Sequence, residues 1–443
     1  MNSIISHKSS NLSGEMIVPG DKSISHRSLI IGSAVTGKII VNNLLESEDV
    51  LATANALRKM GVPINKLSNN KWEIFGSGIG SLSGTNNILD MGNSGTGARL
   101  LMGLVAGSDV EATFIGDQSL SKRPMKRIIS PLIETGATIE NFNNDTLPIK
   151  IKGSKITLPI EYESTVASAQ VKSSILLAGL SSIGTTSIIE PSLSRDHTER
   201  MLKYFGAKIE TIKLKNSKWK ITLDGIPTLK PLDINVPSDP SSASFPIVSA
   251  LITPNSKVKV MNVCVNDLRT GLFKTLIEMG ANIKFTNSRE INGELIADIS
   301  AETSKLNGIT VPKLRAASMI DEYPILAIAA VKAEGDTIME GIEELRYKET
   351  DRIKAVCEGL QKVGVKTIET HNSMVVKGLG PQGQINQNIE INSNLDHRIA
   401  MSFLCLGLIS EKPIKVNDTD TIKSSFPFFL DKMKKIGAKF EQL

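Results

Sequence analysis

The stretch Lys59-Met60-Gly61-Val62 has five counterparts along the chain, and together they decide the fold. The counterparts are Glu134-Thr135-Gly136-Ala137, Tyr204-Phe205-Gly206-Ala207, Glu278-Met279-Gly280-Ala281, Lys362-Val363-Gly364-Val365 and Lys435-Ile436-Gly437-Ala438. Their glycines follow one another at intervals of 70 to 84 residues, each after an amphipathic helical pattern. A glycine directly after a helix supplies the left-handed backbone that ends it. Six such phrases at near-equal spacing predict one supersecondary unit repeated six times.

Each repeat is expected to contain two helices and about four strands, which makes the chain an α/β (α+β) protein. The helices that end at the repeated glycines are predicted at residues 49–60, 125–135, 198–205, 270–279, 352–363 and 428–436. The helices that open the repeats are predicted at residues 23–34, 95–106, 168–178, 241–251, 319–331 and 397–406. A chain of 443 residues is too long for one core, and the Pro- and Ser-containing residues 235–242 lie near its midpoint. We therefore expect two lobes of three repeats each.

Composition restricts the class of protein. Aromatic residues make up 4% of the chain, which argues against a stacking surface for nucleic acid, and the net charge of +5 suits small anionic ligands. We expect no membrane segment and no signal peptide, because no apolar run is long enough. Cys264, Cys357 and Cys405 lie far apart among apolar residues, as in a reduced cytoplasmic protein. No paired Cys or His spacing occurs, so no metal site is predicted.

Polar residues gather where the opening helices are expected to begin. These starts contain residues 22–23, 93–99, 168–172, 241–242, 321–322 and 396–398. A helix start has unpaired N–H groups and the positive end of the helix dipole, so it attracts anions. If the repeats are equivalent, the starts in each lobe point the same way, and two facing lobes would direct them into one anion-binding cleft.

Charged side chains add to this prediction. Residues 19–27 place Lys22 and Arg27 at a turn that opens into a helix, and residues 122–127 form a second cationic segment. Such cations suit phosphate or carboxylate groups. Asp321 and Glu349 are the candidate acid–base residues, because each lies at a helix start beside cations. For each of these segments an ordinary helix cap or solvated charged face is the alternative.

With these segments in place, the chain resembles the 5-enolpyruvylshikimate-3-phosphate synthase family from end to end. The resemblance is carried by residues 20–27, 92–99, 122–125, 168–172, 195–199, 319–324, 346–352 and 396–401. The phrases at residues 194–199 and 319–324 are similar to the bacterial second class of this family. The resemblance implies the two-lobed enolpyruvyl transferase fold, with six βαβαββ repeats and a double crossover. Residues 1–20 and 238–443 would form lobe 1, residues 21–237 would form lobe 2, and the active site would lie in the cleft between them.

The resemblance also implies a reaction. The enolpyruvyl group of phosphoenolpyruvate is transferred to the 5-hydroxyl of shikimate 3-phosphate by addition and elimination, which releases phosphate. This is a step of the shikimate pathway towards chorismate and the aromatic amino acids. No cofactor, no metal, no nucleic acid and no membrane are implied, and the family norm is a cytoplasmic monomer.

The site residues follow from the same resemblance. The catalytic residues would be Asp321, Glu349, Lys22 and Lys348. The residues for shikimate 3-phosphate would be Lys22, Ser23, Arg27, Ser168, Ala169, Gln170, Arg195, Asp321 and Lys348. The residues for phosphoenolpyruvate would be Lys22, Gly95, Arg123, Gln170, Arg352 and Arg398. Asp321 would accept the hydroxyl proton, and Glu349 would protonate the methylene carbon. Ala169, Glu344 and Ser424 depart from residues that many relatives carry at these places.

Two other functions are alternatives. The UDP-N-acetylglucosamine enolpyruvyl transferases share the fold and the enol donor, but they use a loop cysteine that residues 116–127 lack. A non-catalytic anion-binding or nucleic-acid-binding protein could be built on the same repeat. Asp321 and Glu349 argue against it, because carboxylates would repel a polyanion.

Overall fold

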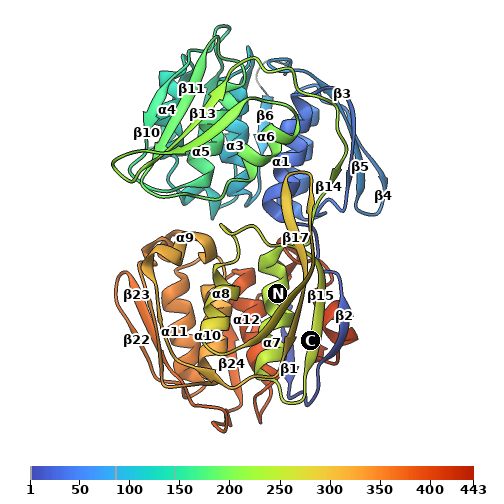
Figure 1. Cartoon of the computed structure of the whole chain (residues 1–443), viewed down its shortest axis with the longest axis vertical. Helices are drawn as coiled ribbons and strands as arrows, with labels where there is room; N and C mark the ends of the chain where they lie inside the picture. Colours follow the sequence, from blue (N-terminus) through green and yellow to red (C-terminus); the bar gives the residue numbers. More distant parts are fainter. Residues whose placement is uncertain (1, 85–86, 144) are drawn as a thin grey trace. The chain divides into compact units, whose positions relative to one another are not determined.

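The structure is a computed structural model that describes residues 2–84, 87–143 and 145–443. It divides into two compact units (Figure 1). Unit 1 consists of the residues up to Pro19 together with Pro237–Arg289 and Leu295–Leu443, and unit 2 consists of Gly20–Val236 and Glu290–Glu294. In the described part of the chain, every helix is too short or too polar to cross a lipid bilayer.

The plan of one repeat is visible in unit 2. It consists of β6 (Asn87–Asp90), α3 (Gly95–Ala106), β7 (Glu111–Ile115), α4 (Lys126–Glu134), β8 (Thr138–Asn143) and β9 (Thr146–Lys152), with the short η1 (Leu120–Lys122) before α4. The sheet has the order β6-β7-β9-β8, with β6 parallel to β7 and the other neighbours antiparallel. The parallel pair requires a crossover, which α3 provides.

The other five repeats follow this plan. Unit 2 also contains α1 (Lys22–Ser33), β3 (Thr36–Asn42), α2 (Glu48–Lys59), β4 (Ile64–Ser68) and β5 (Lys71–Ser77), then β10 (Glu161–Glu163), α5 (Ala169–Gly179), β11 (Thr185–Glu190), α6 (His197–Tyr204), β12 (Ile209–Lys213), β13 (Trp219–Asp224) and β14 (Ile234–Asn235). Unit 1 contains β1 (Ile4–His7), β2 (Ser13–Met16), α7 (Pro240–Ile252), β15 (Lys257–Cys264), α8 (Gly271–Glu278), β16 (Asn282–Ile291) and β17 (Glu294–Glu302). It continues with β18 (Leu306–Asn307), β19 (Thr310–Val311), η2 (Lys313–Arg315), α9 (Ala316–Met319), α10 (Tyr323–Val331), β20 (Ala333–Glu334), β21 (Asp336–Glu340), η3 (Glu343–Tyr347), α11 (Arg352–Lys362), β22 (Thr367–Glu369) and β23 (Ser373–Lys377). The last repeat contains β24 (Ile389–Asn392), α12 (His397–Gly407), β25 (Ile414–Asn417), η4 (Thr419–Ser424), α13 (Phe429–Lys435) and β26 (Lys439–Gln442).

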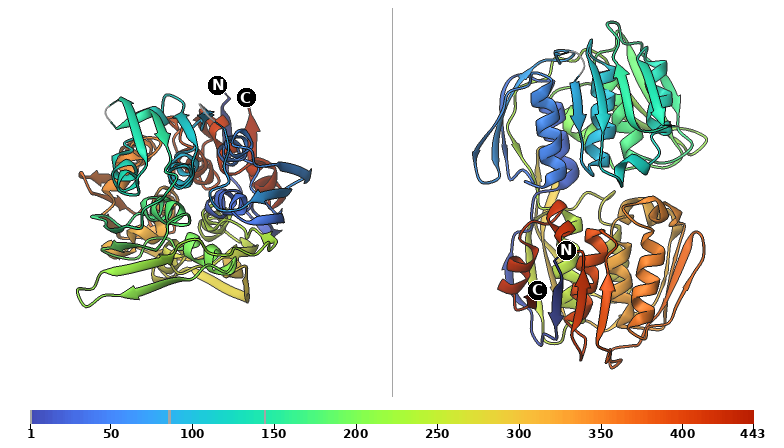
Figure 2. Two further views of the ribbon diagram at one scale, coloured as in Figure 1. Left: turned by 90° about the horizontal axis from the view of Figure 1, so that it is seen from above. Right: turned by 180° about the vertical axis from the view of Figure 1, so that it is seen from behind.

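Three repeats are completed by strands that are distant in sequence. β14 lies parallel to β3 and completes the first sheet of unit 2, and β2 completes the sheet of β15 in the same way. β1 lies between β25 and β26, so both ends of the chain meet in one sheet (Figure 2). These pairings close the two units and were not foreseen from the sequence.

The opening helices form the interior of each unit. In unit 1, α7, α10 and α12 pack against one another, and in unit 2 α3 packs against both α1 and α5. All nine residues of α10 are buried, as expected for a helix that is apolar all round. The sheets lie outside the helices of each unit (Figures 1 and 2).

The repeated glycines end helices as predicted. Their φ angles are +87° at Gly61, +96° at Gly136, +101° at Gly206, +97° at Gly280, +83° at Gly364 and +108° at Gly437. All lie in the left-handed region that side chains disfavour. The predicted helix at residues 319–331 is wrong in one respect: it is broken into α9 and α10, with Asp321 in the turn between them. Pro324 explains the break, because proline fits the first turn of a helix but not its interior.

The expected lobe boundaries differ from the units at three places. Gly20 groups with unit 2 and Pro237 with unit 1, each one residue from the expected boundary. The expectation also put residues 290–294 in lobe 1, whereas these five residues group with unit 2. They form the tip of the β16–β17 hairpin, where Glu294 lies 2.7 Å from His197 Nδ1 and the carbonyl of Gly293 accepts a hydrogen bond from Arg200.

Candidate active site

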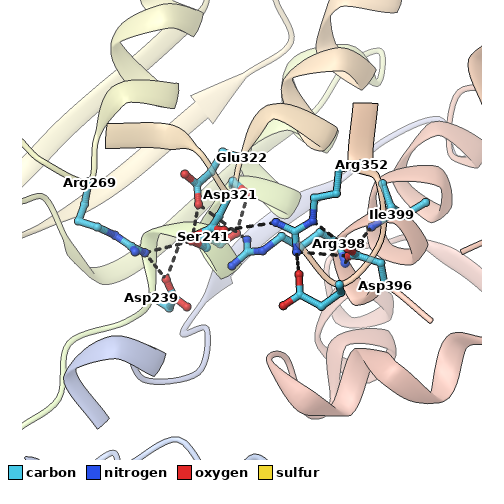
Figure 3. A network of polar contacts seen from close by, with 11 residues as sticks. Asp239, Ser241, Arg269, Asp321, Glu322, Arg352, Asp396, Arg398 and Ile399 are labelled. Atoms are coloured by element: carbon cyan, nitrogen blue, oxygen red, sulfur yellow. Dashed lines mark hydrogen bonds and ion pairs between the residues drawn. The ribbon is translucent and has the colours of Figure 1, made fainter. Parts of the chain in front are cut away.

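The candidate site residues of unit 1 are centred on Arg352, the first residue of α11 (Figure 3). Its side chain is almost fully buried, and its Nε donates to Asp396 Oδ2 at 2.8 Å. Asp396 is itself fully buried and also accepts the backbone N–H groups of Arg398 and Ile399 at the start of α12. Asp396 therefore ties the Arg352 guanidinium to the beginning of the helix that carries Arg398.

The two remaining guanidinium nitrogens of Arg352 reach both predicted acid–base residues. Nη1 lies 3.3 Å from Asp321 Oδ1, and Nη2 donates to Glu349 Oε2 at 2.5 Å. Burial lowers the pKa of Arg352, but Asp396, Glu349 and Asp321 outweigh it and raise that pKa well above its usual range. A permanently charged guanidinium thus holds two carboxylates that keep 17% and 22% of their side-chain surface exposed.

Arg398 lies in the same network but is held differently. Its Nη1 is 3.8 Å from Glu322 Oε1, and its side chain donates no hydrogen bond to any residue in the described ranges. Glu322 in turn accepts a short hydrogen bond from Ser241 at the start of α7. Arg398 is therefore a nearly buried cation whose donors are available to a ligand (Figure 3).

In unit 2, Lys22 lies at the start of α1 and forms an ion pair with Asp49 of α2. One turn further along both helices, His26 Nδ1 is 2.9 Å from Thr53 Oγ1. These two contacts at i and i+4 hold α1 against α2 and fix the place of Lys22. Burial, and then the charges of Lys22 and Arg27, hold the pKa of His26 well below its usual value, so its imidazole is neutral at neutral pH.

The start of α3 brings together further predicted residues. Arg99 Nη1 donates to Gln170 Oε1 at 2.9 Å, and Gln170 Nε2 donates to Thr96 at 3.0 Å. Arg123 donates to Asn93 and, at 3.1 Å, to Ser119. A Cβ added at Gly95 would lie 3.0 Å from Arg99 Nη1 and 3.1 Å from Arg123 Nη1. The absent side chain at Gly95 thus lets two guanidinium groups approach one helix start.

Arg27 and Ser168 have structural partners. Arg27 is buried and donates from Nε to Thr198 Oγ1 and from Nη2 to Ser173 Oγ, both at 2.7 Å. Burial lowers the pKa of Arg27 to about 10, and the charge of Arg195 contributes to the same direction. The Ser168 hydroxyl accepts from the N–H of Val171 and caps α5. The capping alternative therefore holds for Ser168, which leaves its proposed role in phosphate binding a prediction.

In unit 1, Arg352 brings Asp321 and Glu349 together, and Asp396 links Arg352 to the backbone of Arg398. Lys348 directly precedes Glu349 in the chain. In unit 2 the predicted residues lie on several elements: Lys22, Ser23 and Arg27 on α1, Gly95 on α3, Arg123 before α4, Ser168, Ala169 and Gln170 at the start of α5, and Arg195 before α6. Lys423, beside the departure at Ser424, is mostly exposed and lies 3.8 Å from Asp420.

Sequence reasoning missed four side chains that hold the predicted ones. These are Asp49, Arg99, Glu322 and Asp396. Arg99, Glu322 and Asp396 lie inside the polar helix starts described above. A charged residue at a helix start is therefore the sequence signal that could have identified them. Asp49 lies outside these segments, and only the packing of α2 on α1 identifies it.

The fold of the chain is similar to that of solved enolpyruvyl transferases. The enolpyruvyl transferase NikO from Streptomyces tendae superposes with a TM-score of 0.79 over 100% of this chain and 98% of its own, at 15% identity. At that identity the match shows the fold alone, which is that of the enolpyruvyl transferases. The predicted fold class is thereby confirmed.

Closer relatives define the family. The model described as EPSP synthase (3-phosphoshikimate 1-carboxyvinyltransferase) matches residues 6–433. Proteins with the name 3-phosphoshikimate 1-carboxyvinyltransferase from Parvibaculum lavamentivorans and Bartonella tribocorum are 51% and 50% identical, over 99% and 98% of this chain and 97% and 98% of theirs. EPSP synthase from Acinetobacter baumannii has a TM-score of 0.88 and 41% identity over the full length of both chains.

The chain belongs to the EPSP synthase family. The predicted family, transferase class and step of the shikimate pathway are confirmed by this membership. The oligomeric state, the cellular location and the roles of individual residues stay predictions.

Proposed function

We propose that residues of both units act on one pair of substrates, phosphoenolpyruvate and shikimate 3-phosphate, and that Asp321 and Glu349 exchange the protons of the reaction. The observation that carries this proposal is the Arg352 guanidinium, which holds both carboxylates while Asp396 anchors it from behind. A fixed cation gives two carboxylates a defined separation and orientation, which proton transfer requires.

Asp321 is the base for the hydroxyl. Its carboxylate lies 3.3 Å from Arg352 Nη1 and offers an oxygen that can accept a proton. As the 5-hydroxyl oxygen attacks C2 of phosphoenolpyruvate, Asp321 takes the hydroxyl proton. Lys348, next to Glu349 in the chain, supplies a positive charge near the attacked centre.

Glu349 is the acid for the methylene carbon. Glu349 accepts a hydrogen bond from Arg352 Nη2. The carboxylate of phosphoenolpyruvate can replace the Glu349 carboxylate as the acceptor, because the two groups are alike. Once displaced from the guanidinium, the Glu349 carboxyl carries the proton of this step. The proton goes to C3 as the C2–O bond forms. When the C2–O bond to phosphate breaks, the proton leaves C3 again and restores the enol double bond.

The cations of the two units take the anionic groups. Arg398 and Arg352 bind phosphoenolpyruvate from unit 1, and Arg123 and Lys22 bind phosphate groups from unit 2. Gly95 leaves room for the ligand beside Arg123. Lys22 must exchange its partner Asp49 for phosphate, which replaces one anionic partner by another.

A proton-exchange assay tests the roles directly. In D2O, transfer from phosphoenolpyruvate to shikimate 3-phosphate should place deuterium at C3 of the product, and phosphate release should require both substrates and continue with a chelator present. The Glu349→Gln variant should lose deuterium incorporation and turnover together. Retained incorporation in Glu349→Gln would remove Glu349 from the role of acid and leave the family reaction intact.

A further inference from the structure

Glu322 is a buried carboxylate to which the reaction assigns no proton. It directly precedes α10, and 3% of its surface is exposed. Its side chain makes no capping hydrogen bond to the helix, so the ordinary reason for an acidic residue at a helix start is absent. Among the described residues, its Oε2 has no hydrogen-bond partner. Burying such a group costs several kcal/mol unless nearby charges compensate it, at an order of magnitude set by desolvation.

The compensation comes from two arginines. Arg269 Nη2 donates to Ser241 Oγ at 3.0 Å, and Ser241 passes a hydrogen bond on to Glu322 Oε1. On the other side, Arg398 Nη1 is 3.8 Å from the same Oε1. Figure 3 shows Ser241 and Glu322 next to each other in this network. A serine hydroxyl can accept one hydrogen bond and donate another, so it fixes the carboxylate without neutralising it.

Two consecutive carboxylates therefore face two different arginines of unit 1. Asp321 contacts Arg352 and Glu322 contacts Arg398. The two pairs are different: Arg352 is fully engaged by hydrogen bonds, whereas Arg398 is held by charge at a distance too long for a hydrogen bond. An ion pair of this kind orients the Arg398 guanidinium, and its N–H groups can still donate hydrogen bonds to a ligand.

We propose that Glu322 is a positioning residue that aims Arg398 at phosphoenolpyruvate. This inference rests on the proposed role of Arg398 in binding that substrate. Glu322 touches neither substrate. It acts through Arg398, and the chain of contacts from Arg269 through Ser241 keeps its own carboxylate in place.

The first test is the Glu322→Gln variant, which keeps the shape and the hydrogen bond from Ser241 but removes the charge. KM for phosphoenolpyruvate should rise on the order of tenfold, because the pair lacks a direct hydrogen bond and is weaker than a fully bonded buried pair. KM for shikimate 3-phosphate and kcat should change less than about twofold, within the range of neutral substitutions. Glu358→Gln is the matched control, because Glu358 is also 3.8 Å from its cation, Lys354, but is exposed.

A double variant separates the outcomes. In an Arg398→Lys background, Glu322→Gln should add little to the rise in KM, since the group through which it acts is already changed. Additive effects, or an equal rise in both KM values, would overturn the positioning role. No change of KM in Arg398→Lys would instead contradict the proposed function of Arg398. Should Glu322→Gln fail to fold, Ser241→Ala takes its place and should raise the same KM by about threefold; an unchanged KM would count against the proposal.

Discussion

Lys172 in unit 2 and Arg352 in unit 1 are both buried cations that face more than one carboxylate, but the two clusters differ in how far their carboxylates are exposed to solvent. Lys172 Nζ lies 3.1 Å from Glu190 and 2.7 Å from Glu199. It also donates to the carbonyl of Ser194 at 3.1 Å. The side chains of Lys172 and Glu190 are fully buried and that of Glu199 is 8% exposed, so the cluster is closed.

The cluster around Arg352 is open on one side. Only Asp396 is fully buried, whereas Asp321 and Glu349 keep part of their surface exposed. Burial opposes the charge of both cations, yet the facing carboxylates raise the pKa of Lys172 as they do that of Arg352. A buried cation with carboxylates is therefore not by itself a sign of catalysis. The accessibility of the carboxylates separates a reactive cluster from a structural one.

The largest expected effect is on the open cluster. Asp321→Asn should lower kcat by about 10²–10⁴-fold, because the hydroxyl loses its base, and should leave the thermal midpoint nearly unchanged. Phosphate release dependent on shikimate 3-phosphate measures the rate. Asp336→Asn, an exposed partner of Lys377 in the same unit, is the control. A variant with near-normal turnover would remove Asp321 from the mechanism.

Substitution in the closed Lys172 cluster should lower stability, in contrast to the loss of turnover expected for Asp321→Asn. Lys172→Met leaves two buried carboxylates without their cation and should lower the free energy of unfolding of unit 2 by about 3–5 kcal/mol. Both tryptophans, Trp72 and Trp219, lie in unit 2, so their fluorescence in a denaturant series reports on this unit. Lys155→Met, which breaks an exposed pair with Asp109, should change this free energy little. Lost turnover with unchanged stability would assign the Lys172 cluster a functional role instead of a structural one.

A smaller effect is expected where both clusters stay intact. Gly95→Ala places a Cβ 3.0 Å from Arg99 Nη1 and 3.1 Å from Arg123 Nη1, so both guanidinium groups must shift by a few tenths of an ångström. KM for phosphoenolpyruvate should rise about fivefold, which corresponds to roughly 1 kcal/mol of crowding. KM for shikimate 3-phosphate serves as the internal control. Equal changes in both values would show that Gly95 lies away from phosphoenolpyruvate.

The smallest effect concerns His26, a buried side chain that stays uncharged. Its pKa is lowered in the folded protein, so the unfolded state binds a proton first as the pH falls. Stability is therefore fully present above about pH 6.5 and declines below it, by at most about 1.4 kcal/mol per pH unit from this one group. His26→Asn should make the decline between pH 6.5 and 5 shallower when unfolding is followed by tryptophan fluorescence. Parallel curves for the two proteins would contradict the assignment.

The repeat and most of its helices could be predicted from local sequence. Gly61 and its five counterparts mark helix ends because a left-handed residue is a local requirement. Helix periodicity placed α3 correctly at residues 95–106, whereas Pro324 broke a helix that an apolar run alone predicted as continuous. The insertion of β1 between β25 and β26 lay beyond this reasoning, since a four-residue strand carries no signal for partners about 400 residues away.

The six repeats, the family and the residues at the helix starts could be identified from the sequence alone, because each depends on a short contiguous phrase. Which side chains meet became visible in the folded chain: Asp396 contacts Arg352, 44 residues away, and Ser241 contacts Glu322, 81 residues away. It also decided that the carboxylates around Lys172 are closed off and those around Arg352 are not. The physical reason is that burial and pairing depend on which helix starts pack together, and packing is a property of the whole unit.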